Sequence, residues 1–223
     1  MYELTNVTKT YAQGKRTVTA LRNVSVSIPD GQMVAIQGPT GGGKSTLLQM
    51  LGALDRPTDG TVELGASNLS QLGDGKLGTI RATEIGFVFQ GFNLIPTLTA
   101  QENVETALAP IGVPASERRS RAAAALASVG LGERLTHLPA ELSGGQQQRV
   151  AIARALAKEP TVLLADEPTG NLDEDTRDDI MDLLEGLWRD RGLTLIVVTH
   201  DTAVAARAQR RLHLTQGVLK EVA

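Results

Sequence analysis

One stretch constrains the fold of this chain more than any other: residues 33–50, MVAIQGPTGGGKSTLLQM. It joins a short apolar run, typical of a buried strand, to a glycine-rich turn and then to a run with the composition of a helix. A strand that is apolar on both faces belongs to a sheet that helices cover on both sides. The stretch therefore predicts an α/β fold with a mainly parallel sheet.

The turn in this stretch, GPTGGGKST at residues 38–46, fits the pattern G-x-x-x-x-G-K-[ST] between a strand and a helix. Its glycines let backbone N–H groups wrap phosphate oxygens, and the helix N-terminus adds partial positive charge. We expect Lys44 to reach the β- and γ-phosphates of a nucleotide, Ser45 to bind Mg²⁺ and Thr46 to donate to the α-phosphate. The expected contacts are Gly38, Pro39, Thr40, Gly41, Gly42, Gly43, Lys44, Ser45 and Thr46. The alternative, a glycine-rich turn that merely precedes a helix, does not account for the strand, the lysine and the helix together.

Strands and helices alternate along the rest of the chain. The runs at 85–90, 161–166 and 193–200 are short and apolar, which predicts buried strands. Two alternating runs before residue 29 predict an antiparallel pair, and RLHLTQGVLKEV predicts a closing hairpin. An amphipathic helix is predicted at about 173–192, where apolar residues recur at helical spacing: Ile180, Leu183, Leu184 and Leu187.

Residues 91–158 contain helix signals but no clear strand. Expected helices end at Pro110, at Gly130 and before Pro160. We therefore expect a single domain over residues 1–223. Its α/β core, with an N-terminal antiparallel β subdomain, would comprise residues 1–90 and 159–223, and an α-helical lobe would be inserted at 91–158.

Composition and charge exclude several classes of function. The chain has no cysteine, which excludes disulfides and thiolate metal sites. Its net charge is −3 and it has no long basic block, so we expect no nucleic-acid partner. The N-terminus lacks the apolar segment of a signal peptide, and the longest apolar runs fall far short of the ~20 residues that span a bilayer. A membrane role must therefore come through a partner.

Two acids end the apolar run VLLADE at 162–167. A buried strand delivers its last side chains to the carboxyl edge of the sheet, where open α/β sheets bind ligands. Because neighbouring strand residues point to opposite sides, we assign the acids different tasks. Asp166 is expected to bind Mg²⁺ and Glu167 to polarise the attacking water. The alternative, an acidic cap on the following helix, fits poorly with the apolar run before the pair.

A second anion-binding turn lies at 141–150, ELSGGQQQRV. Ser143, Gly144 and Gly145 open a predicted helix whose N–H groups and dipole attract anions, but the turn has no lysine. One triphosphate already occupies the first loop. We infer that this turn binds the γ-phosphate of a nucleotide held by a second copy, so that two head-to-tail copies enclose two nucleotides. Taken alone, Ser-Gly-Gly is a common loop sequence.

These motifs, in this order, resemble those of the ATP-binding cassette (ABC) ATPases over essentially the whole chain. LSGGQQQR resembles the signature motif, and Tyr11 resembles the aromatic that stacks on adenine. Gln90 resembles the Q-loop glutamine, Asp173 the D-loop aspartate at the dimer interface, and His200 the switch histidine at the γ-phosphate. The alternatives are an aromatic on a strand face for Tyr11 and a helix cap for His200.

The resemblance implies a P-loop NTPase core and hydrolysis of ATP with Mg²⁺. It implies catalytic roles for Lys44, Gln90, Glu167 and His200. The metal ligands it implies are Ser45, Gln90 and Asp166. The signature residues expected at the nucleotide of the other copy are Ser143, Gly144, Gly145 and Gln146.

The implied partners are a second copy and an integral membrane subunit of permease type. The coupling helix of that subunit would lie in a groove near Gln90, with this chain peripheral on the cytoplasmic face of the membrane. LGALDRPTDG and ADEPTGNLD resemble the group of LolD, MacB and FtsE ATPases. That group usually has serine at the positions of Thr40, Gly42 and Gly91, and only Thr40 keeps a hydroxyl.

Three alternative functions stay open at this point. An FtsE-type regulatory ATPase would signal to a membrane partner without transport. A DNA-associated ABC ATPase is disfavoured by the single cassette and the lack of cysteine. A catalytically silent subunit is disfavoured by the intact motifs.

Overall fold

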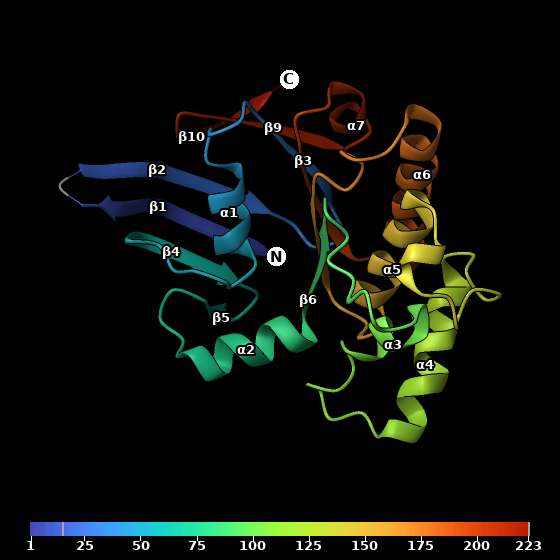
Figure 1. Cartoon of the computed structure of the whole chain (residues 1–223). Helices are drawn as coiled ribbons and strands as arrows, with labels where there is room; N and C mark the ends of the chain where they lie inside the picture. The colour runs from blue at the N-terminus through green and yellow to red at the C-terminus, as the bar shows by residue number, and fades with distance from the viewer. Residues whose placement is uncertain (15, 223) are drawn as a thin grey trace. The chain divides into compact units, whose positions relative to one another are not determined.

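The protein falls into two units of chain in a computed structural model that describes residues 1–14 and 16–222 (Figure 1). The first unit contains Met1–Arg81 together with the segment from Thr194 onward. The second unit contains Ala82–Leu193. Each unit has its own strands and its own buried side chains.

The first unit contains a four-stranded antiparallel sheet of order β2-β1-β4-β5. Its strands are β1 (Tyr2–Gln13), β2 (Arg16–Ile28), β4 (Asp59–Leu64) and β5 (Ser67–Asn68). Alternate residues of β1, such as Tyr2 and Leu4, are buried, which confirms the predicted antiparallel pair. β4 and β5 were not predicted from the sequence, because they carry too few apolar residues to give a strand pattern.

Parallel strands form the other part of the first unit. β3 (Met33–Gln37) pairs in parallel with β8 (Thr194–Thr199) and β9 (Arg210–Thr215). β10 (Val218–Val222) pairs antiparallel with β9, which confirms the closing hairpin. Every residue of β8 is buried, as its continuous apolar run predicts.

Short helices connect these strands. α1 (Lys44–Leu51) follows β3, and α7 (Thr202–Ala206) follows β8. α2 (Asp74–Thr83) precedes β6. Neither α2 nor α7 was predicted from the sequence.

The second unit combines two parallel strands with helices (Figure 1). β6 (Ile85–Phe89) pairs with β7 (Val162–Asp166). The helices are α3 (Ala100–Glu105), α4 (Ala115–Ser128), the 3-10 turn η1 (Pro139–Glu141), α5 (Gly144–Leu156) and α6 (Glu174–Arg191). All residues from 91 to 158 are described, and none of them is in a strand. The division into a core and an inserted lobe stays a prediction, since the two units divide the chain at other points.

Two helix ends show how local chemistry sets the boundaries. α6 ends at Arg191 and is capped by Gly192, whose φ of 62° is the left-handed conformation typical of a helix stop. α3 ends five residues before Pro110, where the sequence predicted its end. The backbone hydrogen bonds that follow the helix join residues three apart instead of four, for example from the Leu108 N–H to the Glu105 carbonyl. This 3-10 pattern ends the α-helix early.

Candidate nucleotide-binding site

The predicted site residues fall into two groups, one in each unit. Tyr11, the phosphate loop at 38–46 and His200 lie in the first unit. Gln90, the signature turn, the acid pair and Asp173 lie in the second. Each group is tied together by its own contacts.

The phosphate loop runs from the end of β3 into α1, as predicted. Gly43 directly precedes α1 as its N-cap and has φ 104°, and a Cβ at this position would lie 2.5 Å from the Ala20 carbonyl oxygen. A Cβ on Gly38 would collide with the Leu214 carbonyl oxygen of β9. Both positions therefore require glycine because backbone passes directly behind the loop.

The turn between β9 and β10 supports the loop from this side. The Gly217 N–H donates to the Gly42 carbonyl at 3.2 Å. The Gly217 carbonyl in turn accepts from the Arg22 N–H at 2.8 Å. The hairpin at the end of the described chain thus fixes one side of the phosphate loop.

Lys44 folds over the loop that precedes it. Its Nζ donates to the Gly38 carbonyl at 2.8 Å and to the Pro39 carbonyl at 3.2 Å, and the residue is only 9% exposed. Ser45 and Thr46 follow in the first turn of α1. The lysine is thereby placed at the mouth of the loop, where a phosphate-binding role requires it.

His200 comes directly after β8. The β3–β8 register pairs Gln37 with Thr199, so Gly38 and His200 leave neighbouring strand ends. The residue that caps α7 is Asp201, whose Oδ1 accepts from the Ala203 N–H at 2.7 Å. The alternative of His200 as a helix cap is therefore wrong.

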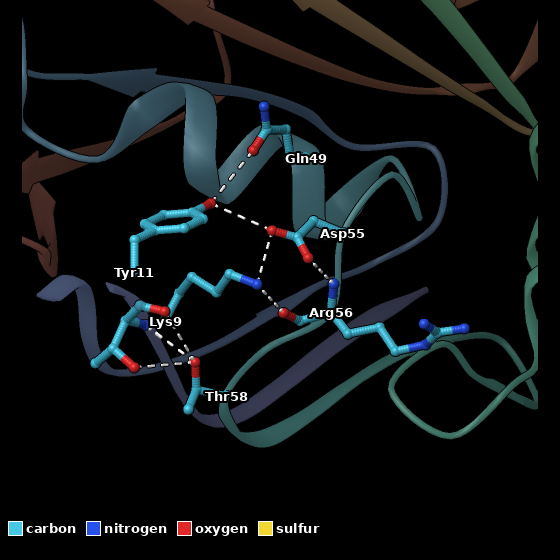
Figure 2. Close-up of polar contacts among 7 residues, drawn as sticks. Lys9, Tyr11, Gln49, Asp55, Arg56 and Thr58 are labelled. Carbon is cyan, nitrogen blue, oxygen red and sulfur yellow. Dashed lines mark hydrogen bonds and ion pairs between the residues drawn. The ribbon is translucent and has the colours of Figure 1, made fainter. Parts of the chain in front are cut away.

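Tyr11 lies on β1 and is held by side chains that the sequence analysis missed (Figure 2). Its hydroxyl lies 3.3 Å from Asp55 Oδ2 and 3.5 Å from Gln49 Oε1. The Lys9 ammonium lies 5.1 Å from the centre of the ring. The i, i+2 spacing of Lys9 and Tyr11 on a strand was the signal that could have found this contact.

The acid pair stands at the end of β7, next to the end of β6. The register pairs Phe89 with Asp166, so Gln90 and Glu167 leave neighbouring strand ends. β7 stops at Asp166, and Glu167 has φ 45°, in the left-handed region that costs a non-glycine residue roughly 1–3 kcal/mol. The expectation that strand alternation separates the two acids is therefore wrong, because a backbone turn separates them instead.

The segment after Glu167 is tied to α5 and to Gln90. Gln148 of α5 is fully buried and its Nε2 donates to the Pro168 carbonyl at 2.5 Å. Its Oε1 has no hydrogen-bond partner among the described residues. The side chains of Gln90 and Asn171 also meet: Gln90 Nε2 donates to Asn171 Oδ1 at 3.3 Å, and Asn171 Nδ2 donates to the Gln90 carbonyl at 3.0 Å. Gln148 was not among the predicted site residues, because no pattern in the sequence distinguishes it from its glutamine neighbours.

The signature turn forms a capping box at the start of α5. Ser143 Oγ accepts from the Gln146 N–H at 3.3 Å, and Gln146 Oε1 accepts from the Ser143 N–H at 3.0 Å. A Cβ on Gly145 would lie 2.6 Å from Thr176 Cγ2. The helix tip thus lies against α6, and the capping box holds the backbone of the predicted anion site.

Asp173 caps α6. Its Oδ1 accepts from the Thr176 N–H at 2.9 Å, and this hydrogen bond lowers the pKa of the Asp173 carboxyl. The alternative of Asp166 or Glu167 as the cap of this helix is therefore wrong. The expected position of Asp173 at a dimer interface stays a prediction.

The predicted Mg²⁺ ligands are one hydroxyl, one amide and one carboxylate: Ser45, Gln90 and Asp166. This set suits Mg²⁺, which prefers oxygen ligands and is usually bound by one or two carboxylates together with waters and phosphate oxygens. Among residues 1–14 and 16–222, no group of three His, Cys, Asp or Glu side chains is gathered for a metal. A metal bound mainly by phosphate does not need such a group.

A surface cavity of about 330 Å³ lies in the second unit, beside the strand that leads to Gln90. The rings of Phe87 and Phe89 stack there with centroids 5.5 Å apart. Burial lowers the pKa of the nearby Lys158 to about 8. The lining residues are Phe87, Phe89, Asn93, Thr106, Ala107, Arg154, Ala155 and Lys158.

Within the described part of the chain, no helix has both the length and the apolar character needed to cross a bilayer.

Comparison with known protein families gives a direct match. The family described as ABC transporter matches residues 21–170. The chain is 46% identical over 217 residues to the lipoprotein-releasing system ATP-binding protein LolD of Geobacter metallireducens, covering 97% of this chain and 96% of LolD. It is 48% identical over 217 residues to the macrolide export ATP-binding/permease protein MacB of Hyphomonas neptunium. That match covers 97% of this chain but 34% of MacB.

The chain is also similar to a solved structure, both in sequence and in fold. That structure is a dimer of the ATP-binding cassette MJ0796 of Methanocaldococcus jannaschii, in a post-hydrolysis state bound to ADP and Pi. Its TM-score is 0.91 at 48% identity, covering 100% of this chain and 98% of that chain.

Proposed function

Because this chain belongs to the ATP-binding subunits of ABC transporters and is an ATPase of that family, we propose that two copies of it close on ATP and drive a membrane partner of the LolD or MacB type. The observation that carries this proposal is the second anion-binding turn at the tip of α5. It has the helix N-terminus and the capping box of such a site but no lysine of its own. Such a turn fits a role at a nucleotide held by another copy.

The dimer of MJ0796 with ADP and Pi supports the same arrangement, since that protein is 48% identical to this chain. In a head-to-tail dimer the same surface of each copy faces the other, and both sites are equivalent. Each site would combine the phosphate loop of one copy with Ser143, Gly144 and Gly145 of the other.

The chemistry falls to a few residues of this chain. Lys44 and the loop amides would hold the triphosphate, and Ser45, Gln90 and Asp166 would be the residues that hold Mg²⁺. When bound, Mg²⁺ neutralises charge on the phosphate oxygens. Glu167 takes the proton from the attacking water, and His200 stabilises charge on the γ-phosphate. Positioning and electrostatics supply most of the rate.

The membrane partner would dock at the cavity beside Gln90. Its lining includes the aromatic side chains of Phe87 and Phe89 and the basic side chains of Arg154 and Lys158. This combination suits an apolar segment with acidic residues. Docking there would place the chain at the cytoplasmic face of the membrane as a peripheral subunit, close in sequence to Gln90, the glutamine expected to bind Mg²⁺.

The shared site can be tested by mixing two inactive variants. Ser143→Arg blocks the turn of one copy, and Lys44→Ala removes the phosphate lysine of the other. A mixed dimer keeps one intact composite site, so we expect ATPase activity to return on mixing. Activity that stays absent, while size measurements show that mixed dimers form, would contradict a site shared between copies.

The proposed partner has its own test. Pull-down of the wild-type chain from its native membranes, followed by identification of the membrane subunit, is expected to recover a permease. Phe89→Ala is expected to weaken that association without changing ATP affinity. Association with a membrane-anchored regulator of cell-wall enzymes instead would contradict the transport part of the proposal.

A further inference from the structure

Two residues with no assigned role, Lys9 and Asp55, fix the ring of Tyr11 (Figure 2). Lys9 and Tyr11 are two residues apart on β1, so their side chains emerge on the same face of the sheet. The Lys9 ammonium lies 5.1 Å from the centre of the Tyr11 ring, within the range of a cation–π contact. One face of the ring is therefore covered by a positive charge.

The Lys9 ammonium is itself held in place. It lies 2.7 Å from Asp55 Oδ2 and donates to the Arg56 carbonyl at 2.7 Å. Its side chain is only 12% exposed. An ammonium with two acceptors and little contact with water keeps one position, so it fixes the ring rather than following it.

The carboxylate of Asp55 connects this lysine to the tyrosine hydroxyl. Asp55 Oδ2 lies 3.3 Å from the Tyr11 hydroxyl, and Oδ1 accepts from the Arg56 N–H at 2.7 Å. Burial alone would raise the pKa of Asp55, but the hydrogen bonds from Lys9 and Arg56 and the charge of Lys9 lower it overall. Asp55 is thus ionised at neutral pH and pairs with Lys9.

A third contact joins the ring to the helix of the phosphate loop. The Tyr11 hydroxyl lies 3.5 Å from Oε1 of Gln49, which is on α1. The same helix begins at Lys44, and the backbone N–H groups of Leu54 and Asp55 donate to the Gln49 carbonyl. The ring and the phosphate loop are therefore attached to one short helix within the first unit.

We propose that Lys9 and Asp55 are positioning residues of the nucleotide site, which hold Tyr11 with one face on the Lys9 ammonium so that the other face is a fixed platform for the base of ATP. This inference rests on the proposed function. A ring ordered before binding loses less conformational freedom when the base stacks on it. Every base has a π-face on which an aromatic ring can stack, whatever hydrogen-bonding groups lie on its edge. The platform should therefore favour a nucleotide over a bare triphosphate but should not select adenine over other bases.

The test compares two ligands that share the phosphates but not the base: ATP and inorganic tripolyphosphate, each with Mg²⁺. Lys9→Met keeps the apolar stem but removes the charge, and Asp55→Asn removes the anion. We expect ATP affinity to fall about 3- to 10-fold in each variant, the scale of one cation–π contact. Tripolyphosphate affinity, and kcat at saturating ATP, should stay at the wild-type level.

Two control variants separate positioning from a general loss of structure. Asp74→Asn breaks the adjacent ion pair with Arg56, whose atoms lie 2.6 Å apart, but does not touch Tyr11. It should leave the affinity for both ligands unchanged. Lys9→Arg keeps a cation and donors, and should recover most of the ATP affinity that Lys9→Met loses.

A double-mutant comparison completes the test. In a Tyr11→Leu background, Lys9→Met should have no further effect on ATP affinity, because its target is gone. The inference is overturned if Lys9→Met still weakens ATP binding in that background. It is also overturned if Lys9→Met weakens tripolyphosphate as much as ATP.

The failure of the inference is distinct from failure of the role proposed for Tyr11. If Tyr11→Leu weakens ATP binding but Lys9→Met does not, the stacking role stands and the positioning role is wrong. If Tyr11→Leu leaves ATP affinity unchanged, both are wrong. The shared ATPase site is tested independently by the mixed dimers.

Discussion

The conformation of Glu167 shows how much a single backbone angle decides at this site. Its φ of 45° turns the chain directly after Asp166, and the Gly170 N–H donates to the Glu167 carbonyl at 3.0 Å to close the turn. A strained residue is kept only where surrounding contacts hold it, and such residues cluster at functional sites. The strain supports the role proposed for Glu167 as the base that accepts the proton of water.

Glu167→Gln should therefore keep ATP binding and lose hydrolysis. The amide has the same shape but does not accept the proton, so kcat should fall by roughly 10²–10⁴-fold. Single-turnover hydrolysis and equilibrium ATP binding measure the two effects separately. Near-wild-type hydrolysis by this variant would remove Glu167 from the role.

Lys158 supplies a prediction about pH. Burial lowers its pKa to about 8, below the value of the unfolded chain. The cost of burying the charge is thus fully present below pH about 8 and is relieved as pH rises toward the unfolded pKa of about 10.4. The contribution of Lys158 to the free energy of unfolding should increase over that window.

Two measurements check this prediction. NMR titration of the Lys158 side chain should give a midpoint near 8. Lys158→Met should gain more stability relative to wild type at pH about 7 than at pH about 10, in denaturant unfolding. An ordinary lysine midpoint would show that the side chain is solvated.

At the scale of elements, the sequence predicted those whose apolar pattern is continuous or strictly periodic. β3, β7 and β8 are buried runs, and α6 buries Ile180, Leu184 and Leu187. Four elements were not predicted from the sequence, because they are short or polar and depend on tertiary contacts: β4, β5, α2 and α7. The hydrogen bond from Gln148 of α5 to the Pro168 carbonyl was also not predicted, since residue spacing does not show where one glutamine side chain points.

The hydrogen bond between Gln148 and the Pro168 carbonyl predicts the effect of replacing Gln148. Gln148→Met keeps the volume but leaves the Pro168 carbonyl without its donor, which costs about 1–3 kcal/mol of stability. Because Pro168 directly follows Glu167, kcat should fall about 3- to 30-fold while ATP affinity stays unchanged.

A neighbouring glutamine is the matched control. Gln147 donates from the same helix to the Leu142 carbonyl at 3.0 Å and not to the segment after Glu167. Gln147→Met should leave kcat near wild type. An equal loss of kcat in both variants would mean that the effect comes from α5 in general.

At the scale of the whole molecule, the order of the motifs was enough to predict an α/β ATPase of the ABC family close to LolD and MacB, and the relatives confirm it. The order of the motifs predicts the fold and the family because each motif must follow a particular strand or precede a particular helix. The residues around the motifs, such as Lys9 and Asp55, were not predicted, because their contacts join segments that are 46 positions apart in sequence.

The dimer proposal gives a prediction about assembly. If release of phosphate after hydrolysis reopens the dimer, Glu167→Gln with ATP and Mg²⁺ should accumulate as a dimer, whereas ADP without phosphate should leave single chains. Light scattering over a range of concentrations measures this. A variant that stays a single chain at saturating ATP would contradict closure by ATP.

The turn between β9 and β10 has a consequence for anyone who shortens or re-engineers this protein. A chain cut before Gly217 would retain each residue named in the nucleotide motifs. It would nevertheless lack the Gly217 N–H that donates to the Gly42 carbonyl, and the phosphate loop would be less well ordered. Truncation from that end should therefore be read as a change to nucleotide affinity, even though no motif is deleted.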